Sequence, residues 1–193
     1  MAFDAFLMVT DPGKAPKIVG ETQDPDFKGA FEISEFSFGA ENTINISSAT
    51  GGAGAGKATF KEFTVKKMTD SSSGLLLKLL GLGGHYKKMM LYLRKSGGGV
   101  SKGKSGKPYL VFGFGMVALK SIEWSGSSGD DVPTESIVFE YGELMVMYRP
   151  QIEDGTLGKG TPLGWSKLNN SDSPTLITSA DFQKAASDAT GAT

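Results

Sequence analysis

Hydrophobic and polar residues alternate along most of the chain, and this predicts β-strands, because a strand turns every second side chain to the same face of its sheet. The alternation is clearest over residues 31–38 and 135–148, and shorter or less regular runs lie at residues 3–9, 42–48, 58–68, 88–95 and 109–124. Glycine, proline, aspartate and serine separate the runs, so residues 10–28 and 125–131 are expected to be loops. The chain is therefore expected to be mainly β.

Helical signals are rare. Residues 75–80 are all strong helix formers, and the Asp-Ser-Ser-Ser cluster at residues 70–73 is typical of a helix N-cap. Gly81 is expected to end this helix as its C-cap. A second short helix is expected over residues 179–189, in the polar and alanine-rich stretch that follows Trp165. Many strands separated by turns, with one accessory helix before this stretch, predict a β-sandwich or a β-barrel.

Composition excludes several classes of protein. The chain has 193 residues, of which 39% are hydrophobic, and this is enough to bury the core of one domain. It has no cysteine and a single histidine, which excludes a disulfide framework, a thiolate metal site and multi-histidine chemistry. No stretch reaches the roughly 18 apolar residues of a membrane-spanning helix, so membrane insertion is not expected. Residues 1–9 carry Asp4 and no basic residue, unlike a secretory signal peptide, so export would need another route.

The net charge of −1 is unevenly distributed along the chain. Residues 1–56 carry eight acidic and three basic side chains, residues 57–107 carry two acidic and twelve basic ones, and residues 108–193 carry eleven acidic and five basic ones. The basic block lies on predicted strands and glycine loops and lacks the helix of a DNA groove reader, so nucleic acid is not an expected partner. It is expected to pair with acidic surfaces of the same chain or of a neighbouring copy.

Residues 51–58, with the sequence GGAGAGKA, resemble the phosphate-binding pattern G-x-x-x-x-G-K-[ST], but Ala58 stands where that pattern needs a magnesium-binding hydroxyl. A phosphate-binding loop also opens a helix, whereas residues 58–65 predict a strand. A phosphate-handling enzyme is therefore the weaker alternative, which nucleotide titration would test. We interpret the segment as a long hairpin loop that a partner molecule orders.

The remaining motifs carry no enzyme chemistry. Residues 113–118 fit G-x-G-x-x-[GA] but lie inside a predicted strand, so their glycines are expected to mark a bulge, a bend or a close backbone approach. His85 has no triad partner or second ligand type nearby and is expected to be structural. The acidic pairs at residues 130–131 and 153–154 lie in expected turns. No catalytic residue, cofactor site or metal site is expected.

A set of short segments, taken in order, resembles one known family. The segments are AFDAFLMV at 2–9, GET at 20–22, FSFG at 36–39, the glycine loop ending in GK at 56–57, FTVKK at 63–67 with Asp70, GHY at 84–86, LYLRK at 91–95, TES at 134–136, YRPQ at 148–151 and GW at 164–165. This set resembles the haemolysin-coregulated protein (Hcp) family of type VI secretion systems over about residues 1–168.

The resemblance implies a small antiparallel β-barrel of two sheets with one flanking α-helix over residues 1–168, followed by a polar C-terminal tail over residues 169–193. Such a tail is too short to fold as a separate domain. The resemblance also implies six-subunit rings that stack head to tail into a tube. The implied partners are further copies of the chain, secreted effector proteins, and the tip and sheath components of the machine. The implied location is the bacterial cytoplasm and, after export without a cleavable signal peptide, the exterior.

Two sets of residues are expected to make contacts. The family's matching glycine loop reaches the adjacent ring, and the residues expected to do so here are Gly51, Gly52, Gly54, Gly56 and Lys57. The strand with Glu35 and Ser37 matches the family's lumen-lining strand, so both side chains are expected to face the lumen and its cargo. The open alternative is that this face is solvated or lies at a subunit contact. The alternative function is a secreted β-sandwich binding module that forms no ring.

Overall fold

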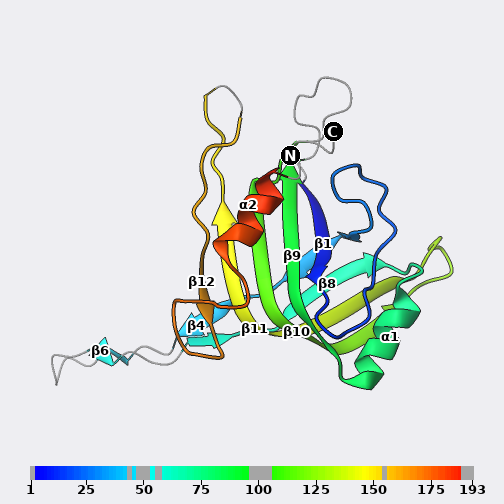
Figure 1. Ribbon diagram of the computed structural model, residues 1–193. Helices are drawn as coiled ribbons and strands as arrows, with labels where there is room; N and C mark the ends of the chain where they lie inside the picture. Colours follow the sequence, from blue (N-terminus) through cyan, green and yellow to red (C-terminus); the bar gives the residue numbers. More distant parts are fainter. Residues whose placement is uncertain are drawn as a thin grey trace.

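The computed structural model describes residues 3–42, 45–46, 53–54, 58–95, 106–153 and 156–187 (Figure 1). Its main element is one antiparallel sheet of eight strands, in the order β2-β1-β9-β10-β11-β8-β3, with β12 paired to β11. These strands are β1 (Phe3–Asp11), β2 (Phe31–Ile33), β3 (Glu35–Ser37), β8 (Phe63–Met68), β9 (His85–Lys95), β10 (Leu110–Ser125), β11 (Thr134–Tyr148) and β12 (Leu163–Ser166). All except β12 overlap the runs in which alternation predicted strands.

The two ends of this strand order meet and close the sheet into a barrel. β2 and β3 stand at opposite ends of the order, yet only Ser34 separates them in the chain. The backbone N–H and the hydroxyl of Ser34 donate hydrogen bonds to the Lys66 carbonyl oxygen in β8, at 2.9 and 3.0 Å. The predicted antiparallel barrel is confirmed, but one continuous curled sheet forms its walls in place of the two sheets that the resemblance implied. The strand predicted over residues 31–38 is broken at Ser34 because β2 pairs with β1 and β3 pairs with β8.

Aromatic side chains fill the inside of the barrel. The rings of Phe63 and Phe114 stack with their centroids 4.2 Å apart, and Phe139 and Tyr141 pack against this pair. All four are buried and come from alternate positions of β8, β10 and β11. Each buried side chain of this size contributes roughly 1.5–3 kcal/mol to folding. The inner core is thus the face that the alternating pattern predicted.

A second hydrophobic core lies on the outer face of the same sheet. There Met90 and Met145 pack under Phe27, from the loop between β1 and β2, and under Ile177 and Phe182, from the C-terminal segment. Side chains are therefore buried on both faces of β9. Strands covered on both faces carry unbroken apolar runs, which explains the sequence MMLYL in this strand.

The first helix, α1 (Ser73–Leu82), follows β8 and buries Leu76 and Leu79 in the inner core. It begins within the predicted capping cluster, but the predicted C-cap at Gly81 is wrong. The helix continues to Leu82, and Gly83 takes the left-handed conformation at φ 63°. A helix with a glycine C-cap ends at the residue that takes the left-handed conformation. Gly83 takes this conformation, whereas Gly81 is still helical.

The second helix, α2 (Ser179–Ser187), confirms the helix predicted in this stretch as far as the described residues extend. It lies against the outer face of the sheet (Figure 1), where Phe182 is fully buried, as is Ile177 just before the helix. The segment expected as a polar tail is thus folded onto the barrel over its described part. Neither described helix has the length and hydropathy that crossing a membrane requires.

Candidate functional site

A two-stranded arm extends away from the barrel. Its strands are β4 (Ala40–Asn42), β5 (Asn45–Ile46), β6 (Ala53–Gly54) and β7 (Ala58–Phe60), with β4 paired to β7 and β5 paired to β6. Figure 1 shows β4 and β6 progressively farther from the barrel. The pairing confirms the predicted hairpin, and Ala58 begins a strand rather than the helix that a phosphate-binding loop would need. Of the residues expected at its tip, Gly54 lies in β6 opposite Asn45, whereas Gly51, Gly52, Gly56 and Lys57 lie outside the described residues.

Tyr141 of the barrel fixes the base of this arm. Its hydroxyl donates a hydrogen bond to the Lys61 carbonyl oxygen at 2.9 Å, and its ring meets Phe60 edge-on with centroids 6.5 Å apart. The Lys61 backbone N–H in turn donates to the Gly39 carbonyl oxygen at 2.8 Å, which joins the two sides of the arm. Burial, with a contribution from the nearby Glu140 carboxylate, raises the pKa of Tyr141 to about 12, so this hydroxyl remains a donor.

A row of ion pairs runs beside the base of the arm. The Lys120 ammonium is hydrogen-bonded to Glu62, which raises the pKa of Lys120, and it also lies 4.0 Å from Glu140. Glu140 is 3.4 Å from the Lys167 ammonium on its other side. Charges of both signs alternate along the row. The row therefore compensates its own charge beside the point where the arm leaves the barrel.

The predicted lumen residues lie on the exposed face of β3. Glu35 and Ser37 are exposed, whereas Phe36 between them turns inward and packs against the inner core. The Glu35 carboxylate pairs with the Lys66 ammonium at 2.8 Å across the β3–β8 ladder. Ser37 lies opposite Thr64 in that ladder. The surface here is polar and locally charge-balanced.

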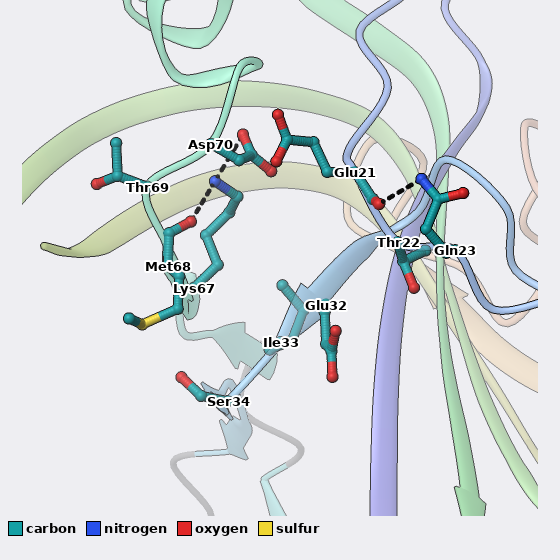
Figure 2. A pocket seen from close by; sticks show the side chains of 10 residues that line it. All are labelled: Glu21, Thr22, Gln23, Glu32, Ile33, Ser34, Lys67, Met68, Thr69 and Asp70. Atoms are coloured by element: carbon teal, nitrogen blue, oxygen red, sulfur yellow. Dashed lines mark hydrogen bonds and ion pairs between the residues drawn. The ribbon is translucent and has the colours of Figure 1, made fainter. Parts of the chain in front are cut away.

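A cavity of about 520 Å³ opens where β2 and β8 diverge. Figure 2 shows the ten residues around it: Glu21, Thr22, Gln23, Glu32, Ile33, Ser34, Lys67, Met68, Thr69 and Asp70. The Lys67 ammonium has three N–H donors, and they meet Asp70 at 3.0 Å, Glu135 at 3.1 Å and the Met68 carbonyl at 2.8 Å. The lysine is therefore a charge-compensated part of the wall rather than a nucleophile.

Sequence reasoning missed the anchor of the C-terminal segment. The carboxylate of Glu143 in β11 is fully buried and accepts hydrogen bonds from the Ser166 hydroxyl and from the backbone N–H groups of Thr175, Leu176 and Ile177. Burial opposes ionisation, but these donors outweigh it and hold the pKa of Glu143 below its ordinary value. Its donors are mostly backbone groups, which no side-chain pattern reveals.

The glycines of β10 were the one signal of this packing. A Cβ atom at Gly113 would lie 2.9 Å from Ile177 Cγ2, and one at Gly115 would lie 3.0 Å from Leu176 Cβ. This confirms the interpretation of these glycines as marks of a close approach, here by the C-terminal segment. Within the described residues, no group of three or more acidic or histidine side chains is arranged to hold a metal ion.

The chain matches a known protein family over most of its length. Residues 6–148 match the family described as "Type VI secretion system effector, Hcp". The chain belongs to the Hcp family. A relative, "Protein hcp1" of Pseudomonas aeruginosa, is 29% identical over 115 residues, which make up 59% of this chain and 68% of the relative. The resemblance to the Hcp family carried by the short segments of the sequence is confirmed.

Solved structures agree with this assignment. One described as "Structure of a type six secretion system protein" has a TM-score of 0.76 at 31% identity and covers 88% of this chain and 99% of its own. Hcp1 from Salmonella typhimurium has a TM-score of 0.68 at 20% identity, covering 90% and 100% of the two chains, and this likeness concerns the fold. As an Hcp protein, this chain is a secreted structural protein of type VI secretion with a β-barrel fold.

Proposed function

We propose that this protein is the subunit of a type VI secretion inner tube. Six copies close into a ring, the rings stack head to tail, and the lumen carries secreted effector proteins. The role is structural and includes no catalysis. The protein reaches the exterior from the bacterial cytoplasm together with the tube, and contacts the tip and sheath components of the machine.

The hairpin arm is the observation that carries this proposal. Among the described residues, β4 through β7 pair only with one another and with no strand of the barrel. A two-stranded hairpin is marginally stable in water without a further packing surface. The base of the arm is nevertheless fixed by Tyr141 and Lys61, so the arm points in a set direction. Such an element is suited to dock on a neighbouring molecule. In a tube of stacked rings, the next ring supplies a neighbouring subunit for every arm.

Ring closure requires a heterologous contact, in which one face of a subunit binds a different face of the next. The uneven charge along the chain supports such a contact, since complementary patches fix the orientation of approaching copies.

Glu35 and Ser37 are proposed to face the lumen. Lys66 compensates the Glu35 charge, so this surface offers hydroxyls and paired ions rather than a strong net field. Exposed ion pairs of this kind contribute little binding energy each, about 0–1 kcal/mol. Cargo held by many such weak contacts can be retained and later released.

Deleting residues 52–56 tests the role of the arm. The deletion shortens the hairpin while the barrel and its base contacts persist, so light scattering should still give the mass of six copies, whereas the rings should not stack into tubes in electron micrographs. The matched control replaces the same five residues by GSGSG, which preserves the length of the arm and should preserve stacking. Deleted rings that stack normally would refute the role of the arm, whereas a wild-type chain that forms no ring would refute the proposed function itself.

A further inference from the structure

The two ends of the β10–β11 ribbon are candidates for a contact between copies. The ribbon pairs from Leu110 opposite Tyr148 at its open end to Ser125 opposite Thr134 at its turn, with a register shift between Leu119 and Ser121. With 16 residues in β10, its contour is roughly 50 Å long. In Figure 1 the arrowhead of β11 and the turn that joins β10 to β11 lie on opposite sides of the molecule. The two ends of one copy therefore do not meet each other.

The open end exposes a continuation of the inner core. Phe112, Val146 and Leu163 are direct cross-strand neighbours on β10, β11 and β12. In the same row Leu91 of β9 is fully buried, but the exposed fraction rises to 38% at Val146 and 69% at Leu163. Tyr148 on the same face of β11 is 57% exposed. Exposed apolar side chains gathered in this way mark an interaction surface.

Basic residues lie on the chain segments that flank this apolar surface. Arg149 directly follows Tyr148, and its backbone N–H is bonded to the Tyr109 carbonyl oxygen at 2.7 Å, which places the arginine at the same end. Lys107 and Lys159 are exposed on the segments that lead into β10 and toward β12, with Glu153 as an acidic neighbour. We name this surface the basic end and define it by Lys107, Val146, Tyr148, Lys159 and Leu163.

The turn has the opposite charge. It exposes three carboxylates, Glu123, Asp130 and Asp131, and residues 121–134 contain no lysine or arginine. Two apolar side chains of the same segment are also exposed: Trp124 at 44% and Val132 at 37%. These five residues define the acidic end.

We infer that the basic end of one copy binds the acidic end of the next copy. Both ends offer apolar side chains that a contact would bury, and their rims are opposite in charge, so each end fits the other and repels its own kind. A contact between two different surfaces of the same chain is heterologous and repeats from copy to copy. The inference rests on the proposed function and names the surfaces through which copies join.

Charge reversal tests the inference. One variant carries Glu123→Lys with Asp131→Lys, and the other carries Lys107→Glu with Lys159→Glu; all four positions are exposed, so folding should be unaffected. Each variant alone carries charges of the same sign at both ends. The chain concentration at which half of the protein is assembled, measured by sedimentation velocity, should therefore rise at least about tenfold at low salt. An equimolar mixture restores opposite charges at every contact and should assemble within about threefold of wild type. The control, Lys14→Glu with Lys17→Glu, reverses two exposed lysines elsewhere and should behave as wild type.

Three results would overturn the inference. Variants that assemble as well as wild type would show that these two ends do not join copies. If the same samples contain rings, the proposed function still stands. A mixture that stays unassembled would contradict the pairing of the two ends. A wild-type chain that remains monomeric in every condition would overturn the inference and the proposed function together.

Discussion

The Glu143 carboxylate accepts a hydrogen bond from the backbone N–H of Leu176 at 2.7 Å, although 33 residues separate the two in the chain. The same carboxylate also binds the backbone N–H groups of Thr175 and Ile177. Lys88 adds a second tie, at 2.9 Å from Asp181 in α2. Charged groups therefore attach the C-terminal segment to the barrel at two places, one beside the buried side chain of Ile177 and one beside that of Phe182.

Replacing Glu143 by glutamine should destabilise the protein by about 2–4 kcal/mol, because hydrogen bonds to a charged acceptor contribute about 1.5–3 kcal/mol each. The amide also turns an NH₂ group toward donors that need an acceptor. Urea unfolding measures the loss, and hydrogen exchange should locate it at residues 175–177. Glu32→Gln is the matched control, since this glutamate is exposed and its replacement should change the unfolding free energy by less than about 0.5 kcal/mol. Equal stabilities for the two variants would contradict the anchoring role.

Acid should weaken this attachment. The folded-state pKa of Glu143 lies below its ordinary value of 4.5, and that of Asp181 lies below 3.8, because their hydrogen bonds outweigh the cost of burial. A carboxylate with a lowered folded-state pKa contributes stability that is present above its unfolded-state pKa and is lost as the pH falls through the folded-state pKa. The unfolding free energy should therefore be level near neutrality and fall below about pH 4.5. Glu143→Gln should flatten this decline, and an unchanged slope would contradict the assignment.

A side chain at Gly113 should disturb the same contact from the other side. Its Cβ would lie 2.9 Å from Ile177 Cγ2 and 3.1 Å from both Met90 Sδ and Phe182 Cζ. Gly113→Ala should cost about 1–3 kcal/mol, the usual cost of overpacking a core. Gly74→Ala is the control, because nothing lies within 4 Å of a Cβ there and alanine favours the helix. Calorimetry should show a lower melting temperature for the first variant and an equal or higher one for the second.

Ser37→Gln tests the lumen assignment. The larger side chain would project from the exposed face of β3 without touching the core, so ring mass should remain that of wild type while co-purification of secreted effectors falls. Ser71→Gln, on the exposed segment before α1, should change neither property. Rings of Ser37→Gln that retain their cargo would place this face outside the lumen, and loss of the rings would place it at a subunit contact.

The strands were predictable because alternation is a local property of the sequence. Phe63 and Val65 face the core and Thr64 faces outward, as their spacing indicates. The end of α1 was not predictable in this way, because Gly81 and Gly83 are both suited to a C-cap. Only the tertiary structure selects Gly83. Local spacing also could not show that the strand predicted over residues 31–38 is shared between two neighbours.

The outer core could not be predicted from the sequence, for a different reason. Ile177 and Phe182 are isolated apolar residues in a polar stretch and form no periodic pattern, yet both are fully buried. In the sequence, Glu143 cannot be told from other glutamates in strands, because its backbone donors lie next to it only in the folded chain. Gly113 and Gly115 did indicate a close approach, but nothing in their sequence identified the segment that approaches.

Negative-stain electron microscopy of the purified chain, combined with native mass spectrometry, tests the central claim most directly. The account predicts hollow rings whose mass equals six copies of the 20.3 kDa chain. Particles that remain single barrels at high concentration, with the mass of one copy, would contradict it.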